Sequence, residues 1–175
     1  DYHLAEAAKN AADHDVRIDF VKADALDYVR EDFYDYIINL YTSFGYFESE
    51  EENQRMLNNI CDSLKAGGFF VMEIMTKEIF ARLFNEREFY DFNDGIYTVR
   101  REIIDDWEKV SNHWKIVKDC NIHEFDIVYY LYSAVELKRM LQKAGFSGIE
   151  CYGTFYGDPY DQNAAQLIVV ATKIG

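Results

Sequence analysis

The sequence has little proline, cysteine and basic charge, and it lacks long apolar runs. It contains one proline and three cysteines, Cys61, Cys120 and Cys151, whose separation fits neither a disulfide framework nor a zinc cluster. We therefore expect no metal site and a reducing, cytoplasmic location. The longest apolar run, 68–75, is far shorter than the roughly 20 residues that cross a bilayer. The first residues show no signal-peptide pattern.

Basic side chains are outnumbered: 18 Lys and Arg stand against 32 Asp and Glu, giving a net charge of −14 at pH 7. The basic residues do not cluster. Such a surface repels a phosphate backbone and an anionic membrane. We therefore expect no nucleic-acid partner and no membrane partner.

Apolar and aromatic residues, by contrast, are abundant. Of 175 residues, 49% are hydrophobic and 17% are aromatic, which is enough for a sizeable core. This composition excludes a disordered tail and predicts a single domain over residues 1–175.

The first half alternates helical and strand patterns. Apolar spacing predicts a helix over 2–12 and a strand over 16–21, and buried strands are predicted over 34–41 and 69–75. Between the last two, Ser49 and Glu52 form a capping-box pattern for a helix over 49–65, ended by Gly67 and Gly68. This order is typical of a doubly wound α/β fold with a mostly parallel sheet.

The pattern changes after residue 76. A helix over 77–84 precedes four β-rich runs at 86–92, 96–105, 108–118 and 121–132, separated by turn signals at 93–95, 105–106 and 119–121. These predict an antiparallel meander, and we interpret 76–132 as an inserted β cap. A helix over 133–144 then follows, with Ser133 and Glu136 as its capping box, before two strands at 148–155 and 166–173.

Four segments occur in an informative order: FYDYI at 33–37, NLYTSFGYF at 39–47, LKAGGFFVMEI at 64–74 and YSAVELKRMLQKAGF at 132–146. Together they resemble a class I S-adenosylmethionine-dependent methyltransferase. The resemblance implies that the last two strands form an antiparallel hairpin at the sheet edge. It also implies that an N-terminal βαβ portion, with a glycine-rich turn and an acidic ribose-binding residue, is missing and lies before Asp1.

The resemblance implies that the cofactor is S-adenosyl-L-methionine and places its binding residues in two segments. Asp24, Ala25 and Leu26 match the acidic turn beside the adenine, and Asn39, Leu40 and Tyr41 match the strand end beside the methionine portion. An aspartate after a strand can also serve only as a turn residue.

Substrate contacts are expected from the following loop and from the cap. The candidates are Ser43, Phe44, Tyr46, Arg100 and Tyr129. Rings in this loop can face a sulfonium centre, although Phe44 and Phe47 can equally pack against the next helix. Arg100 and Arg101 are adjacent on a strand, so they point to opposite faces and one of them can face the pocket.

The implied activity is methyl transfer to a nitrogen or oxygen of a small-molecule acceptor. Alignment and dehydration can supply most of the catalysis, so the catalytic residue is not assigned. The candidates for a base are His113, His123, Tyr129 and Glu73. His113 and His123 can pair across neighbouring cap strands, or both can be solvated residues of the sheet surface.

Two other functions compete with this one. The chain can be a non-catalytic methyltransferase-fold domain that binds a partner through its aromatic cap, and the cap can also form a homo-oligomer interface. A nicotinamide-dependent Rossmann enzyme is the third alternative, but the terminal hairpin and the NLYTSFGYF loop fit it poorly.

Overall fold

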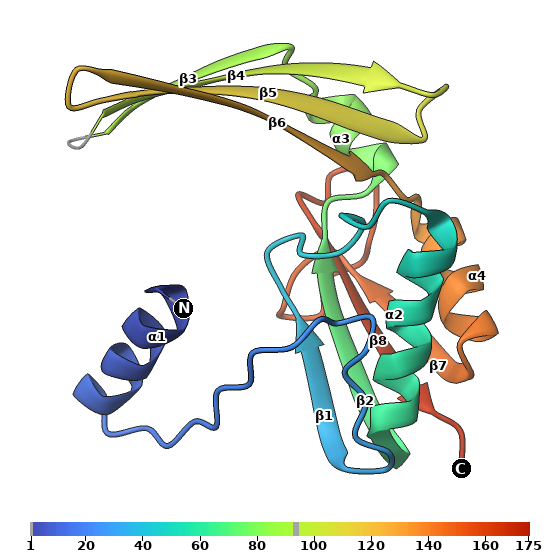
Figure 1. The fold of residues 1–175 in the computed structure, drawn as a ribbon. Coiled ribbons are helices and arrows are strands. Elements are labelled where there is room, and N and C mark those ends of the chain that lie inside the picture. Colours follow the sequence, from blue (N-terminus) through green and yellow to red (C-terminus); the bar gives the residue numbers. More distant parts are fainter. Residues whose placement is uncertain (1, 93–94) are drawn as a thin grey trace.

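The computed structural model describes residues 2–92 and 95–175, and it contains two separate four-stranded sheets (Figure 1). The first sheet has the order β1-β2-β8-β7 and the second β3-β4-β5-β6. The strands are β1 Tyr34–Asn39, β2 Leu64–Ile74, β3 Arg87–Phe92, β4 Gly95–Ile104, β5 Lys109–Lys118, β6 Asn121–Tyr130, β7 Phe146–Tyr152 and β8 Leu167–Lys173. The helices are α1 Tyr2–Asp13, α2 Glu50–Ser63, α3 Lys77–Leu83 and α4 Ala134–Lys143.

The first sheet combines parallel and antiparallel pairing. β1 and β2 are parallel, whereas β8 runs antiparallel to β2 and to the edge strand β7. The predicted edge hairpin is therefore confirmed. α2 and α4 pack against each other, and Gln54 Nε2 donates to the Met140 carbonyl at 3.0 Å. Their apolar sides and the sheet enclose the main core, which includes Leu57, Leu64, Phe70, Met72, Leu137, Leu141 and Leu167.

The opposite face of this sheet carries apolar side chains without a helix over them in the described part of the chain. Tyr36 and Ile38 of β1 are 68% and 65% exposed. The Tyr36 ring stacks on Phe69 of β2 with centroids 5.8 Å apart. A doubly wound fold has helices on both faces of its sheet, so that part of the prediction is met on one face only within residues 2–92 and 95–175.

The predicted helix over 2–12 is confirmed as α1, but the predicted strand over 16–21 is wrong. Residues 16–21 are irregular, and Val16 and Ile18 are exposed. The alternation of apolar and polar residues forms a strand only beside a partner backbone, and no described strand pairs with this segment. α1 buries no residue against the rest of the described structure.

The start of α2 was predicted correctly and its end was not. Ser49 and Glu52 form the expected reciprocal capping box. The helix ends at Ser63, because the fully buried Leu64 takes an extended conformation and begins β2. Gly67, expected as the helix stop, instead lies within β2 with φ +76°.

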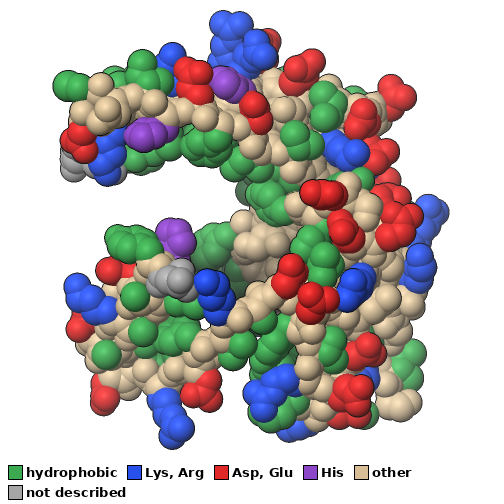
Figure 2. Space-filling view, viewed as in Figure 1, with side chains coloured by type: hydrophobic (Ala, Val, Ile, Leu, Met, Phe, Trp, Pro, Cys, Tyr) green, Lys and Arg blue, Asp and Glu red, His purple; other side chains and the backbone are tan. Residues whose placement is uncertain are grey.

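The second sheet is the predicted antiparallel meander, and we call its four strands, β3 to β6, the cap. Each of its strands pairs with the next along the chain. Asp119 and Cys120 form a two-residue turn with φ near +50° and +60°, so Lys118 pairs with Asn121. The turn expected at 93–95 lies largely outside the described residues. The cap extends over a wide hollow, which the space-filling view shows between it and the rest of the molecule (Figure 2).

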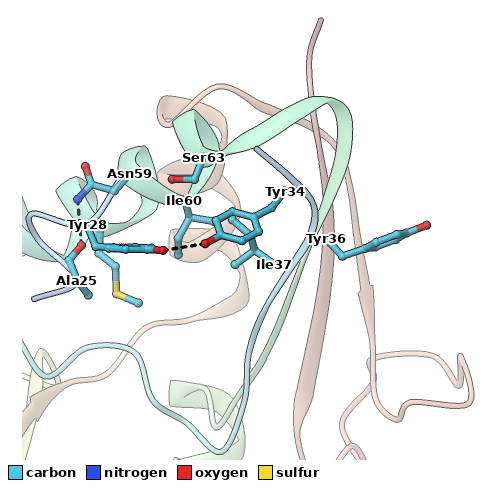
Figure 3. A pocket seen from close by; sticks show the side chains of 9 residues that line it. Ala25, Tyr28, Tyr34, Tyr36, Ile37, Asn59, Ile60 and Ser63 are labelled. Carbon is cyan, nitrogen blue, oxygen red and sulfur yellow. Dashed lines mark hydrogen bonds between the residues drawn. The ribbon is translucent and has the colours of Figure 1, made fainter. Parts of the chain in front are cut away.

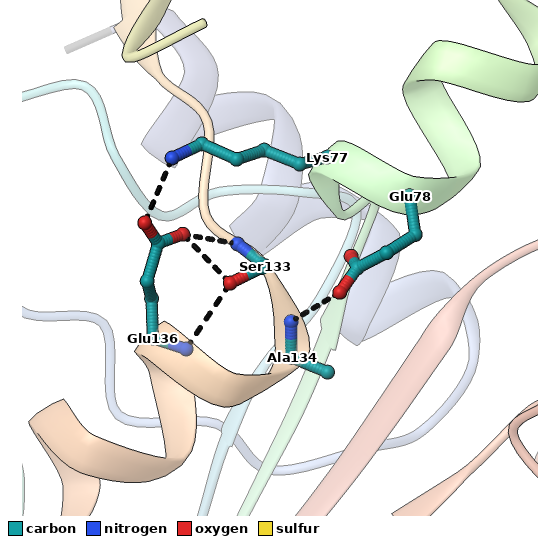
Figure 4. Close-up of polar contacts among 5 residues, drawn as sticks. All are labelled: Lys77, Glu78, Ser133, Ala134 and Glu136. Carbon is teal, nitrogen blue, oxygen red and sulfur yellow. Dashed lines mark hydrogen bonds and ion pairs between the residues drawn. The ribbon is translucent and has the colours of Figure 1, made fainter.

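The two ends of the cap meet beside α3 and α4 (Figure 4). The Lys77 backbone N–H donates to the Tyr132 carbonyl at 3.0 Å, and Lys77 Nζ pairs with Glu136 at 2.9 Å. The predicted capping box is confirmed, because Glu136 and Ser133 hydrogen-bond reciprocally at the start of α4. Glu78 accepts a hydrogen bond from the Ala134 N–H at 3.2 Å. The segment that enters the cap and the segment that leaves it are therefore held together by hydrogen bonds and an ion pair between the starts of α3 and α4.

None of the helices in the described part of the chain is long and apolar enough to cross a bilayer.

Candidate functional site

The chain turns sharply where β1 ends. Tyr41 and Thr42 both have left-handed backbone conformations, with φ +58° and +53°. This region is strained for residues other than glycine, and most of all for a β-branched threonine. Glu73 of β2 holds the turn: its carboxylate accepts the Tyr41 N–H at 2.6 Å and its carbonyl accepts the Thr42 N–H at 3.3 Å. Strain maintained in this way is typical of binding sites.

Asn39 is the last residue of β1 and carries a buried polar atom without a partner. Its Oδ1 is inaccessible to solvent and accepts no hydrogen bond from the described residues. Most buried side-chain oxygens are hydrogen-bonded, so this one requires an explanation. A ligand donor at the strand end would satisfy it. The neighbouring Leu40 carbonyl already accepts a hydrogen bond from Ser43 Oγ at 2.6 Å.

The acidic turn over 24–26 is well ordered by hydrogen bonds. Asp24 Oδ1 accepts the Leu26 N–H at 2.9 Å, so the aspartate does act as a turn residue. Asn59 of α2 donates to the carbonyls of Ala25 and Leu26 at 3.0 and 2.8 Å. The turn is thereby fixed to the helix that follows β1.

A mainly apolar cavity of about 290 Å³ lies beside this turn and the open edge of β1 (Figure 3). The Tyr28 and Tyr34 hydroxyls are 2.8 Å apart within it, and Tyr36 points to the other side of the strand. Ala25 lines the cavity, but Asn39, Leu40 and Tyr41 do not. The structure therefore does not enclose the six predicted cofactor residues in one cavity.

A second cavity of about 390 Å³ lies between the end of β1, α3 and the cap. Its lining residues are Thr42, Tyr46, Met75, Phe80, Leu83, Phe84, Asn85, Glu88, Tyr90, Arg101 and Tyr129. The rings of Tyr46 and Tyr129 lie 5.0 Å apart. Burial raises the pKa of both phenols, so each remains protonated at neutral pH and can donate a hydrogen bond.

Charged groups gather on the cap side of this cavity. Arg101 Nη2 lies 2.8 Å from Glu88 Oε2, and the Tyr90 hydroxyl donates to the same carboxylate oxygen. The hydrogen bond from Arg101 holds the pKa of Glu88 below its usual range. Glu88 is therefore ionised at neutral pH and is a weak base, but it is a strong hydrogen-bond acceptor.

Of the predicted substrate residues, Tyr46 and Tyr129 line this cavity, and the other three do not. Phe44 is 1% exposed and packs on Tyr132 at 5.5 Å, so it belongs to the core. Ser43 closes the turn after β1. Arg100 pairs across the sheet with His113, on the face opposite to Arg101.

The histidines lie apart. His113 Nδ1 is 2.8 Å from Asp126 on the outer face of the cap, whereas His123 pairs with Ile116 on the inner face. They do not pair with each other, so the pairing alternative is excluded, and His123 is a solvated residue of the sheet surface. Neither histidine lines the second cavity. Glu73 supports the turn after β1.

The sequence-based reasoning missed Glu88, Tyr90 and the residues of α3 that line the cavity. The signal was strand alternation: Glu88 and Tyr90 are two residues apart on β3, and Glu88 pairs with Val99, two residues from Arg101. All three therefore share one face. Among the described residues, no group of three histidine, cysteine or acidic side chains is arranged to hold a metal ion.

No protein-family model and no curated protein matches this sequence. Solved structures do match. An S-adenosylmethionine-dependent methyltransferase from Clostridium acetobutylicum ATCC 824 has a TM-score of 0.84 at 15% identity. The match covers 98% of this chain and 71% of the methyltransferase chain.

Two further structures are similar. The CcbJ methyltransferase from Streptomyces caelestis has a TM-score of 0.75 at 16% identity, covering 89% of this chain and 63% of its own. The sugar N-methyltransferase KedS8 from Streptoalloteichus sp ATCC 53650 has a TM-score of 0.62 at 17% identity, and the match covers 87% of this chain and 61% of the KedS8 chain. The chain has the fold of S-adenosylmethionine-dependent methyltransferases and spans 61–71% of the length of these structures.

Proposed function

We propose that this protein takes part in S-adenosylmethionine-dependent methyl transfer to a nitrogen or oxygen of a small molecule. The observation that carries the proposal is the buried, unpartnered Asn39 Oδ1 beside the strained turn at the end of β1. In open α/β sheets, ligands bind outside the carboxyl ends of the strands, where this atom lies. The fold shared with known methyltransferases supports the same proposal.

Two segments of the described chain offer groups that would hold the cofactor. Asn39 Oδ1 can accept a hydrogen bond from the ammonium group of the methionine portion, and Leu40 and the exposed Tyr41 border the same place. In the acidic turn, Asp24 can accept from the adenine amine while Ala25 and Leu26 border the ring. When bound, S-adenosylmethionine would supply a sulfonium methyl group to the lone pair of the acceptor's nitrogen or oxygen, with the carbon–sulfur electron pair passing to sulfur and the acceptor's proton passing to water.

The residues of the second cavity would then orient the acceptor and exclude water. Tyr46 and Tyr129 offer an aromatic surface and two protonated hydroxyls. The cap covers the hollow from the other side (Figure 2). Positioning and dehydration of the acceptor can supply most of the rate enhancement, so this proposal needs no dedicated base.

Titration calorimetry with S-adenosylhomocysteine tests the cofactor assignment. We expect measurable binding to the chain, weakened about tenfold by Asn39→Ala, which removes one charge-assisted hydrogen bond. Asp24→Ala should also weaken binding. The matched control is Asn121→Ala, in an exposed cap turn far along the chain. If the chain does not bind S-adenosylhomocysteine, the proposal is rejected; if Asn39→Ala binds it normally, the role of Asn39 is rejected.

A non-catalytic partner-binding domain is the second candidate. Exposed rings of the cap, Phe89, Phe92 and Phe125, favour it. Under this alternative, the chain fails to bind S-adenosylhomocysteine and self-associates or captures a protein through the cap. We also propose a cytoplasmic location, which the three free cysteines support. Separately, we propose that the cap forms a subunit interface. Sedimentation at several concentrations tests the interface.

A further inference from the structure

The second cavity presents two different chemical surfaces to a bound molecule. One side is apolar and aromatic, formed by Phe80 and Phe84 with the Tyr46–Tyr129 pair. The other side is formed by the charged groups of β3 and β4. A molecule that fits both must have an apolar face and a polar edge.

The polar side is a preorganised network. The side chains of Arg101 and Glu88 are only 16% and 29% exposed, and the Tyr90 hydroxyl fixes the same carboxylate oxygen from a third direction. Arg101 Nη1 is also 3.4 Å from the Asn85 carbonyl. These contacts leave Glu88 with further acceptor capacity and Arg101 with further donors. The network can therefore bind one group that donates and a neighbouring group that accepts.

The charge balance of the network limits the ligand. Glu88 and Arg101 neutralise each other, so neither a strongly anionic nor a purely cationic molecule gains from the cavity as a whole. Two neighbouring hydroxyl groups, or a hydroxyl beside an amino group, can hydrogen-bond to both Glu88 and Arg101 without breaking the ion pair between them. The volume of about 390 Å³ is near the lower end of the range for ligand pockets, about 300–1,000 Å³, and suits a single ring.

We propose that the acceptor is a single-ring polyhydroxylated or amino-hydroxylated molecule, bound by Glu88 and Arg101 along its polar edge and by Tyr46 and Tyr129 on its apolar face. This inference rests on the proposed methyltransferase function, because it identifies the cavity with the acceptor site. Glu88 acts here as a specificity-determining residue that orients the acceptor.

Tryptophan fluorescence can report this binding. The chain has two tryptophans, and Trp114 stacks near Tyr90 with ring centroids 6.4 Å apart. In a Trp107→Phe background, Trp114 is the single reporter beside the network. The probes are methyl β-D-xylopyranoside and D-glucosamine; cyclohexylamine and benzoate are ring compounds that lack the vicinal polar groups.

We expect both sugar probes to change the Trp114 emission saturably and to bind at least tenfold more tightly than cyclohexylamine and benzoate. Glu88→Gln should weaken sugar binding about five- to tenfold, and Tyr129→Phe should weaken it less. The matched control, Glu102→Gln, lies on β4 on the outer face of the cap and should bind as the parent does. Circular dichroism of each variant confirms that it is folded.

The outcomes separate this inference from the proposed function. If the chain binds S-adenosylhomocysteine but prefers benzoate or cyclohexylamine, or binds no probe, the acceptor class is wrong and the cofactor assignment stands. An unchanged sugar affinity in folded Glu88→Gln would also overturn the role of Glu88. Sugar binding without S-adenosylhomocysteine binding would reject the methyltransferase function and leave a sugar site.

Discussion

At the scale of single residues, the turn after β1 combines strain with accessibility. Tyr41 is 88% exposed, so its side chain contributes little packing, yet its backbone is left-handed. A non-glycine residue in this conformation costs roughly 1–2 kcal/mol. Glu73 provides the contacts that hold it. A costly turn that a neighbouring strand keeps in place is a feature that functional sites share.

Tyr41→Gly should therefore stabilise the fold. Glycine removes the strain, its greater freedom in the unfolded chain offsets part of the gain, and the net increase in the free energy of unfolding should be about 0.5–1 kcal/mol. Urea denaturation measures it. Tyr156→Gly is the control, because Tyr156 is 97% exposed but is not left-handed, and it should not be stabilised. Equal effects in both variants would contradict the strain argument.

At the scale of elements, the start of α4 is linked to the cap through Glu136. Burial raises the pKa of this carboxyl, but hydrogen bonds from Ser133 and Lys77 outweigh burial and hold it below its usual range. The ionised form is therefore favoured by folding. Its contribution to stability is complete above the unfolded pKa of about 4.3 and is lost as the pH falls through the lower folded value.

Glu136→Gln should accordingly lower the melting temperature at pH 7 by a few degrees, since the ion pair with Lys77 is lost. The difference from the parent should shrink below about pH 4 as the native carboxylate is protonated. Thermal unfolding at a series of pH values measures this. Glu6→Gln, on the exposed helix α1, should show no such trend; a difference that persists in acid would indicate a role other than charge.

At the scale of the whole molecule, stability is unevenly distributed. The central strands β2 and β8 pair on both sides and are flanked by the main core. α1 buries none of its residues, and the segment that follows it is irregular. Short helices without packing are marginal in water. α1 should therefore open most easily, the cap less easily, and the first sheet with its core last.

Hydrogen exchange should reveal that order. Amides of β2 and β8 should exchange slowest, those of the cap at an intermediate rate, and those of α1 almost as fast as in an unfolded peptide. Mass spectrometry of peptides covering each element measures the rates. Protection of α1 equal to that of β8 would show that α1 packs against a surface in solution.

Sequence reasoning was most accurate where a local rule decides the structure. Both capping boxes, at Ser49 and Ser133, mark the true helix starts, because the capping residues lie within one turn of each other. The predictions failed where the structure depends on contacts between segments far apart in the sequence. The strand over 16–21 has the right pattern but no described partner. Alternation placed Arg100 and Arg101 on opposite faces, but only the position of the cap over the molecule brings Arg101 to the cavity.

The histidine pairing shows how much depends on one turn. The two-residue turn at Asp119 and Cys120 pairs Lys118 with Asn121, and this register places His113 opposite Asp126. The sequence indicated a turn there but not its length. Since a shift of one residue exchanges the two faces of a strand, every side chain of β6 depended on that detail.

The hydrogen bond between Lys77 and Tyr132 has a consequence for how such proteins diversify. The chain leaves the first sheet and returns to it at points one hydrogen bond apart, so the 54 residues between these two can differ in length or fold without moving the core strands. Insertions whose ends lie close together are readily exchanged. A different insertion could be grafted between these two residues while the surface around Asn39 stayed the same.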